Sequence, residues 1–456
     1  MTEAHAHAHD NAKRYLEELL ELLRIPSIST DMTHQEDMRH AAQWVADNLE
    51  RSGLDTAQVL ETEGHPVVFA EWSGAPAGAP TVLIYGHYDV QPADMIDGWS
   101  RDPFTPAVIG DRIVARGATD NKGQVVAHMK AAESLLATGG CPVNLKYLIE
   151  GEEECGSAHL GAFVAAHHEL LAADICLISD TSMESIDQPS LTYGMRGLAA
   201  LDIVVDGPRQ DLHSGAFGGC LHNPAQALAE IVATLHDVDG RVAVPGFYDD
   251  VAAVSPQERE MLAKAPTSQA AWTEVMGKLP DWGEPGYSRN ERIGIRPTLE
   301  INGISGGYAG DGFKTVIGKH AVAKVSCRLV PDQDPERVFE LVRDRVLAVA
   351  PPTVRCQVTL RDGGLPALTD REHPAMKAAI RAYGYHWPKR DVLLVRAGGT
   401  IPVVATFQQQ LGLPVVLMGF ALPDCGAHGP DEDMPVVMFE SAIDTIIQFM
   451  HQVGKG

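Results

Sequence analysis

Residues 81–90 have the sequence TVLIYGHYDV, in which a mainly apolar run leads directly into a histidine and an aspartate. A short apolar run of this kind is typical of a strand buried on both faces, as in the parallel part of an α/β sheet. Ligands of such sheets bind just beyond the carboxyl ends of the strands. The stretch therefore predicts a central strand that ends at a functional site containing His87 and Asp89.

Four further strand-like runs also lead into residues of metal-binding types. RIVARG, from residue 112, leads to Asp120; LKYLI, from residue 145, leads to Glu153 and Glu154; DICLI, from residue 174, leads to Asp180; and VVLMGF, from residue 415, leads to His428. No structural rule requires all these strand ends to carry ligand types. We therefore expect the side chains to meet at one edge of one sheet.

The donor set indicates a pair of metal ions. Imidazole and carboxylate groups without thiolates suit Zn²⁺, Mn²⁺ or Co²⁺ at a catalytic site. Two histidines and three carboxylates are too many for one tetrahedral ion with an open position, but they suit two ions that share a bridging carboxylate. Asp89 is placed to accept the second ring N–H of His87. Glu153, beside Glu154, is the candidate general base that takes a proton from water and returns it to a leaving amine.

The chain alternates helical and strand patterns, with an interruption in the middle. Helical spacing in residues 11–24 and 37–52 precedes the first strands, and the same texture returns from about residue 368. Between them lie amphipathic strands and helices, as in a smaller domain with an antiparallel sheet. An insertion within that part carries a capping box at residues 255–258. The predicted domains are an α/β domain of residues 1–194 and 367–456 and an inserted α+β domain of residues 195–366.

Composition excludes several classes of protein. The 456 residues suffice for two or three domains, and 36 Lys and Arg against 61 Asp and Glu give a net charge of -25, which repels nucleic acid and anionic membranes. No apolar run approaches the roughly 18–20 residues of a membrane span. Seven cysteines without a C-x-x-C pair indicate reduced thiols, hence a cytoplasmic protein. His5, His7 and His9 offer a second metal site, but we expect them to be incidental residues on a frayed end.

Six motifs together resemble the M20 family of co-catalytic metallopeptidases, in particular the cytosolic non-specific dipeptidase and carnosinase branch. They are GHYDVQP, GATDNKG, EGEEECGS, ISDT, DLHSGAFGG and CGAHGPDE, and they occur in order over nearly the whole chain. The resemblance implies a mixed-sheet, zinc-exopeptidase-like catalytic domain with an inserted lid domain that makes a homodimer. It also implies that one ion is held by His87 and Asp180 and the other by Glu154 and His428, with Asp120 bridging and Glu153 as general base.

The resemblance assigns roles to the inserted domain as well. It implies that His213 reaches the active site of the partner subunit and donates to the developing oxyanion. Arg328 is the kind of residue that grips a substrate carboxylate. By the same resemblance, that subsite is completed by Thr315, His373, Gly399 and Thr400.

The predicted function is a metal-dependent dipeptidase that hydrolyses dipeptides or short peptides with a free C-terminal carboxylate. It would use a water held between the two ions and Glu153 as base. Zn²⁺ and Mn²⁺ accept the same ligands, so the sequence leaves the metal open. Within the family, the alternative is an amidohydrolase of N-acyl amino acids, such as a deacetylase or desuccinylase.

Two alternatives come from other classes of protein. Residues 303–307, GISGG, fit the G-x-S-x-G elbow of a serine hydrolase with Ser305 as nucleophile. That elbow opens a helix, whereas the following YAGDGFKT is typical of a loop. The other alternative is a metal-binding protein without catalysis, against which the presence of Glu153 argues.

Overall fold

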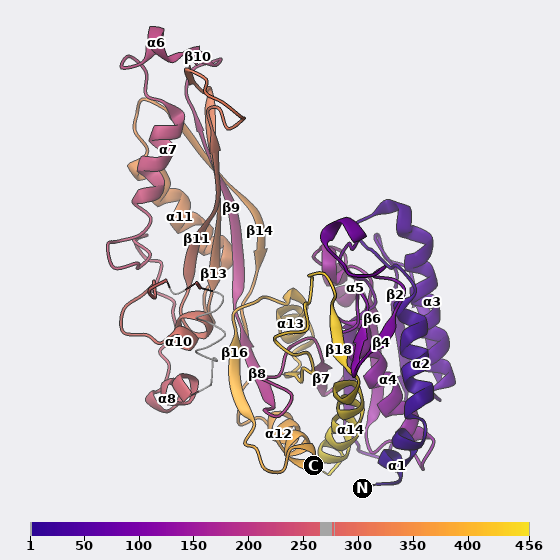
Figure 1. Cartoon of the computed structure of the whole chain (residues 1–456). Coiled ribbons are helices and arrows are strands. Elements are labelled where there is room, and N and C mark those ends of the chain that lie inside the picture. The colour runs from indigo at the N-terminus through magenta and orange to yellow at the C-terminus, as the bar shows by residue number, and fades with distance from the viewer. Residues whose placement is uncertain (1, 265–275, 278, 456) are drawn as a thin grey trace. The chain divides into compact units, whose positions relative to one another are not determined.

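The computed structural model describes residues 2–264, 276–277 and 279–455, which form two compact units (Figure 1). The first unit contains residues 1–193, 369–395 and 406–456, and the second contains residues 194–368 and 396–405. Residues 396–405, which are predicted to belong to the first unit, group with the second in the structure. No helix within the described ranges is long and apolar enough to cross a membrane.

A mixed sheet forms the centre of the first unit, as predicted. Its strands lie in the order β1-β2-β6-β3-β7-β17-β8, of which β6, β3, β7 and β17 are parallel and the outer pairs antiparallel. The strands are β1 (Thr56–Leu60), β2 (Val67–Trp72), β3 (Thr81–His87), β6 (Asn144–Glu150), β7 (Ile175–Ile178), β17 (Val415–Leu417) and β8 (Ser190–Met195). Four residues in succession are buried in β7, as expected of a strand covered on both faces.

The helices predicted at residues 11–24 and 37–52 are α2 (Ala12–Leu23) and α3 (Gln35–Arg51), which begin within two residues of the expected positions. The other helices of the first unit are α1 (Glu3–Asp10), α4 (Lys122–Leu136), α5 (Leu160–Ala166), α12 (Pro374–His386) and α14 (Val436–Val453). Leu19 and Leu23 of α2 are fully buried, as the helical spacing predicts. Helix α4 packs against β3 on one side and α14 on another, so nearly all of its residues are buried.

The expectation of a frayed N-terminal end is wrong. Residues 3–10 form α1, which packs on α4 and α14. Thr2 caps this helix, and His5 is buried with Nε2 3.3 Å from the Asp444 carbonyl. His9 Nε2 lies 2.9 Å from the Asp444 carboxylate. These tertiary contacts order the N-terminal end of the chain, although its polar composition predicts fraying.

The predicted convergence of five strand ends on one sheet is also wrong in two places. The run that precedes Asp120 is β5 (Arg112–Val114), which belongs to a separate sheet with β4 (Ala107–Ile109) and β18 (Asp433–Pro435). His428 follows β17 only after a ten-residue loop, because β17 ends at Leu417. Only β3, β6 and β7 deliver their candidate residues directly from the main sheet.

The second unit is an antiparallel sheet of order β11-β13-β9-β14 with helices packed on it. Its strands are β9 (Gly197–Asp206), β11 (Thr298–Gly306), β13 (His320–Leu329) and β14 (Arg355–Gly364), with a short pair β10 (Leu212–His213) and β12 (Val316–Ile317). Its helices are α6 (Ser214–Phe217), α7 (Pro224–Ala233), α8 (Pro256–Lys264), α10 (Arg289–Gly294) and α11 (Pro335–Val349). Two short strands, β15 (Ala367–Leu368) and β16 (Leu393–Ala397), pair with β8 at the end of the main sheet, and α13 (Pro402–Thr406) follows β16.

Two predictions about the second unit are confirmed. Ser255 caps α8, since its Oγ accepts from the backbone N–H of Glu258 at 3.2 Å. Ser305 lies inside β11, opposite Val322, and the strand does not lead into a helix. The geometry of a nucleophile elbow is therefore not present at Ser305.

Candidate active site

Three neighbouring parallel strands bring the first candidate residues together. His87 is the last residue of β3, and β3 lies between β6 and β7. Glu153 and Glu154 form a single turn of 3-10 helix directly after β6, and Asp180 follows β7 by two residues. Because the carboxyl ends of parallel strands share one edge, His87 is flanked by acidic residues on both sides.

Asp120 reaches the same place from the loop between β5 and α4. Its neighbour Asn121 fixes that loop to the sheet, since Asn121 Oδ1 accepts from the backbone N–H of His87 at 3.3 Å. Asn121 Nδ2 donates to the Ser179 carbonyl at 2.6 Å and to Asp180 Oδ1 at 2.9 Å. One buried amide thus ties Asp120 to the ends of β3 and β7.

The candidate ligands form two groups that share Asp120. One group is His87, Asp120 and Asp180, and the other is Asp120, Glu154 and His428; within each, the potential ligand atoms lie within 4.8 Å of one another. Asp120 Oδ1 lies 3.2 Å from His87 Nε2, and Asp120 Oδ2 lies 3.0 Å from His428 Nε2. Each oxygen of this carboxylate therefore faces a different imidazole, as a bridging ligand requires.

The charges in this cluster fit divalent cations. His87 is fully buried, and its Nε2 lies 3.2 Å from Asp120 and 3.8 Å from Asp180 without a hydrogen bond of good geometry to any described residue. Burial alone would lower the pKa of His87, but Asp120, Asp180 and Asp89 outweigh it and raise that pKa well above its usual value. Burial and the charge of Asp120 raise the pKa of Asp180. A buried imidazole among crowded carboxylates indicates a place where positive charge belongs.

The group around His428 is more open to solvent than the group around His87. The side chain of His428 is 56% exposed, against 0% for His87. Hydrogen bonding to Asp120 and Glu154 raises the pKa of His428 to about 10. The two groups thus share one ligand but differ in access from solvent.

Several contacts orient the ligands. His87 Nδ1 lies 3.1 Å from the Asp89 carbonyl oxygen and 3.3 Å from its carboxylate Oδ1, while Asp89 Oδ2 accepts from the backbone N–H of Glu154 at 3.0 Å. Gln91 Nε2 donates to Glu154 Oε2 at 2.8 Å. Sequence reasoning missed Gln91 and Asn121, although both stand inside the motifs GHYDVQP and GATDNKG. A hydrogen-bonding side chain next to a ligand in the same motif is the signal that could have found them.

Glu153 differs from Glu154 in its surroundings. Burial raises the pKa of Glu153 to about 8, with His87 opposing and Asp180, Glu154 and Asp89 adding to the rise. Glu154, by contrast, is held by Gln91 and faces His428 at 3.2 Å. A carboxyl group that titrates near neutral pH can both accept and return a proton.

The other candidate residues are distributed over three places. In the second unit, His213 ends β10, and its Nδ1 accepts from the backbone N–H of Gly215 at 2.9 Å. Thr315 adjoins it, since its carbonyl accepts from the N–H of Ser214 at 3.0 Å. In the first unit, His373 caps α12, and its Nδ1 accepts from the N–H of Ala375 at 3.2 Å.

Arg328 and Thr400 meet within the second unit. Arg328 Nη1 donates to Thr400 Oγ1 at 2.9 Å, and that hydroxyl donates to the Arg196 carbonyl at 2.6 Å. Gly399, which is exposed, directly precedes the partly buried Thr400. Sequence reasoning missed Arg196, whose Nε holds this turn by donating to the Gly398 carbonyl at 3.1 Å.

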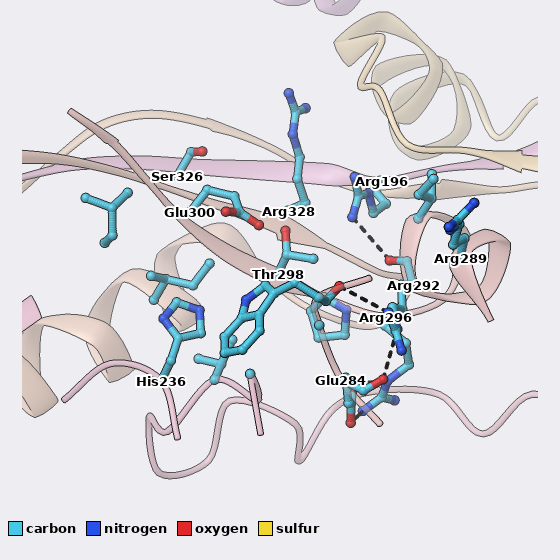
Figure 2. A pocket seen from close by; sticks show the side chains of 18 of the residues that line it. Arg196, His236, Glu284, Arg289, Arg292, Arg296, Thr298, Glu300, Ser326 and Arg328 are labelled. Carbon is cyan, nitrogen blue, oxygen red and sulfur yellow. Dashed lines mark hydrogen bonds and ion pairs between the residues drawn. The ribbon is translucent and has the colours of Figure 1, made fainter. Parts of the chain in front are cut away.

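A cavity of about 670 Å³ in the second unit is lined by Arg196 and Arg328 (Figure 2). Burial lowers the pKa of Arg196 to about 10, and the positive charge of Arg328 contributes to the change. Figure 2 shows Arg328 extending away from Glu284 and Arg296, which form an ion pair at 2.6 Å. The charge of Arg328 is thus not neutralised by that pair and suits an anionic ligand.

His213 and Arg328 lie at opposite ends of the second unit's sheet. Strand β13 begins at His320, and its neighbour Lys319 donates its N–H to Asp211 Oδ1 at 2.9 Å, two residues before His213. Arg328 lies at the other end of β13, eight residues from His320, which is about 27 Å along a strand. Figure 1 shows β10 and α6 together at one end of this sheet.

The chain is similar to known peptidases over almost its full length. A model of "Peptidase family M20/M25/M40" matches residues 83–453. The Cys-Gly metallodipeptidase dug1 of Schizosaccharomyces pombe is 33% identical over 97% of this chain and 96% of its own, and the human Beta-Ala-His dipeptidase is 34% identical over 85% and 79%. The solved structure of the metallo-carboxypeptidase Sso-CP2 from Sulfolobus solfataricus has a TM-score of 0.86 and 32% identity, covering 97% of this chain and 99% of that one. The motifs, the paired ligand groups and these similarities agree, and the chain belongs to peptidase family M20/M25/M40, within its metallodipeptidase branch.

Proposed function

We propose that this peptidase cleaves dipeptides or short peptides with a free C-terminal carboxylate at a site where Asp120 bridges two divalent cations. The observation that carries the proposal is the pair of ligand groups that share Asp120, with Glu153 beside them. His87 and Asp180 complete one group, and Glu154 and His428 complete the other. The nitrogen and oxygen donors suit Zn²⁺ or Mn²⁺, with Co²⁺ as a substitute.

The residues of the chain divide the work of hydrolysis between them. The ions, when bound, lower the pKa of water and polarise the carbonyl of the substrate. Glu153 accepts the proton of the attacking water and returns it to the leaving amine. Asp89 keeps the His87 ring oriented, and Gln91 does the same for the carboxylate of Glu154.

The second unit supplies most of the proposed contacts with the substrate. Arg328, oriented by Thr400, binds the C-terminal carboxylate, with Gly399 and His373 as further members of the subsite. Thr315 adjoins His213, so it joins this subsite from the partner subunit, as His213 does. An N-acyl amino acid carries the same carboxylate, so the amidohydrolase alternative uses the same Arg328. What differs between the two classes of substrate is the free amino group of a dipeptide.

His213 acts on the active site of a partner subunit in a homodimer formed through the inserted domain, which serves as lid and dimerisation domain. The length of β13 supports this assignment. A dipeptide spans at most about 7 Å, much less than the separation between the two ends of that strand. His213 and Arg328 of one chain therefore cannot both contact one dipeptide, whereas residues of two chains can.

The cytoplasm is the proposed location. All seven cysteines lie in the described part of the chain, and none of them is bonded to another. Cys176 and Cys327 are fully buried, and burial raises the pKa of both thiols. Such thiols are inert core residues of the kind found in reducing compartments.

Removal of metal is expected to proceed in two steps. Because His428 is exposed and His87 is buried, a chelator should take the ion held by Asp120, Glu154 and His428 first, and activity should fall with that ion. Metal analysis of samples withdrawn during dialysis checks this order. His428→Ala should retain about one ion per chain in place of two. Full activity without metal, or inhibition only by a serine-directed phosphonate, would favour Ser305 instead.

A panel of substrates separates the two family functions. After reconstitution with Zn²⁺, Mn²⁺ or Co²⁺ separately, we expect hydrolysis of Cys-Gly, β-Ala-His and other dipeptides, and little release from N-acetyl or N-succinyl amino acids. Liberated amino acids are measured in each case. Preferred cleavage of the N-acyl compounds would replace the dipeptidase proposal by the amidohydrolase. Absence of turnover with every substrate and metal would favour the non-catalytic alternative.

Substitutions in the acidic turn distinguish the base from the ligand. Glu153→Gln should lower kcat by about 10²–10⁴-fold with metal content nearly intact, because it removes only the proton acceptor. Glu154→Gln should lower metal content as well. Glu152→Gln is the matched control, since that carboxylate faces His159 and the backbone of His65 rather than the ligand groups. Opposite behaviour of the Glu153 and Glu154 variants would reverse the assignment.

Mixed dimers test the role of His213. His213→Ala should lower kcat by roughly 10²–10³-fold without loss of metal, because an imidazole aimed at the oxyanion stabilises mainly the transition state. When this chain is mixed with Glu153→Gln chains, one site of each heterodimer carries both lesions and the other carries neither. Activity should therefore reappear. If isolated heterodimers remain as inactive as the two parents, His213 does not serve the partner's site.

A further inference from the structure

We propose that Glu432 is a positioning residue that holds Asp120 and His428 at the spacing a shared pair of cations needs. The proposal rests on the ligand assignment above and adds a residue that contacts no substrate. Asp120 and His428 are the two candidate ligands that do not directly follow a strand of the main sheet, so other contacts must fix their positions.

The carboxylate of Glu432 is fully buried and accepts four hydrogen bonds from one loop. Oε2 accepts from Arg116 Nη1 at 2.7 Å and from the backbone N–H of Gly117 at 3.0 Å. Oε1 accepts from the backbone N–H groups of Thr119 at 2.9 Å and Asp120 at 3.0 Å. The last bond fixes the backbone of the bridging ligand itself.

These four hydrogen bonds also argue against a role for Glu432 as a metal ligand. Two carboxylate oxygens offer about four lone-pair directions, and four protein donors already occupy them. Glu432 is therefore not placed to bind a cation in addition. Its charge is paired with Arg116, which is itself 2% exposed and lies over the ring of Trp99 at 5.2 Å.

The backbone of Glu432 connects the same loop to the segment that carries His428. Its carbonyl accepts from the N–H of Ala115 at 3.0 Å, and the next residue, Asp433, pairs with Val114 where β18 meets β5. The N–H of Asp433 donates to the Cys425 carbonyl at 2.8 Å and closes the loop that contains His428. Glu432 thus joins the two segments by both its backbone and its side chain.

The conformation of the His428 loop makes such an anchor necessary. His428 and Asp431 have φ values of 60° and 54°, in the left-handed region that non-glycine residues seldom adopt. A residue in that region persists only where its surroundings hold it there. The bonds on either side of His428, at Cys425 and Glu432, supply that constraint.

The test replaces Glu432 by glutamine, which keeps the shape but turns one oxygen into an N–H donor that faces two other donors. Affinity for at least one of the two ions should fall by about 10–100-fold, measured with Zn²⁺ or Mn²⁺ by competition with a chromophoric chelator. Activity should recover as the metal concentration is raised. Asp433→Asn is the matched control: it weakens the 2.6 Å ion pair between Asp433 of β18 and Arg112 of β5 but leaves the four bonds of Glu432 in place. That variant should bind both ions as the wild type does.

A double substitution separates positioning from general stability. In a His428→Ala chain, the site that Glu432 helps to shape has already lost its imidazole, so Glu432→Gln should weaken metal binding much less than it does in the wild type. An equal loss in both backgrounds would overturn the proposal. So would a Glu432→Gln protein that binds both ions with wild-type affinity and differs only in melting temperature.

A second variant keeps the test decisive if Glu432→Gln does not fold. Glu432→Asp retains the charge but withdraws the carboxylate by about 1.5 Å, too far to keep all four bonds. It should shift metal affinity in the same direction, and unchanged affinity would again overturn the proposal. Wild-type protein that binds no metal would instead overturn the ligand assignment, so the two failures can be told apart.

Discussion

Crowding of negative charge around one buried imidazole is the constraint on which the site depends. Asp89, Asp120 and Asp180 surround the fully buried His87, and the acidic turn after β6 adds further carboxylates. Like charges at such distances oppose one another, and burial removes the water that would screen them. The rest of the first unit must therefore hold these groups together until cations balance them. The parallel strands β3, β6 and β7 lead directly into His87, the acidic turn and Asp180. Buried amides and ion pairs hold the other groups.

The same crowding gives neighbouring residues different chemistry. Glu153 and Glu154 stand in one turn, yet Glu154 accepts a hydrogen bond from Gln91 and faces His428, while burial raises the pKa of Glu153 to about 8. A carboxylate that is hydrogen-bonded and faces an imidazole is suited to bind a cation. One whose charged form is disfavoured is suited to carry a proton. Both residues are glutamates, so it is their different neighbours that suit Glu154 to bind a cation and Glu153 to carry a proton.

How much the sequence could predict depends on how each residue is held. His87, Glu154 and Asp180 follow buried parallel strands, so apolar runs alone place them at one edge. Asp120 and His428 were expected there for the same reason, but they arrive by a different route. Their positions depend on hydrogen bonds between segments more than 300 residues apart, such as that from Asp120 N–H to Glu432. The hydrophobic pattern of a segment does not predict hydrogen bonds to a distant segment.

The N-terminal helix α1 is likewise ordered by distant contacts that its own sequence does not predict. Its alternating His and Ala residues predict no amphipathic face, and its ordering comes from contacts of His5 and His9 with Asp444 on α14. The partner lies more than 400 residues away, so local composition could not reveal it. Local sequence therefore predicts elements that pack through their own periodicity better than elements that distant contacts order.

Charge also bears on how the proposed substrate would be held. A substrate with a free carboxylate brings a further negative charge to a site already crowded with carboxylates, and the cations offset only part of that repulsion. Guanidinium groups bind carboxylates through paired donors, and Arg328 of the second unit is the residue proposed for that role. The strand that carries Arg328 extends about 27 Å toward the end that carries His213, which is too long for both to serve one substrate within one chain. The roles proposed for Arg328 and His213 therefore require that one small substrate be contacted by residues of two chains.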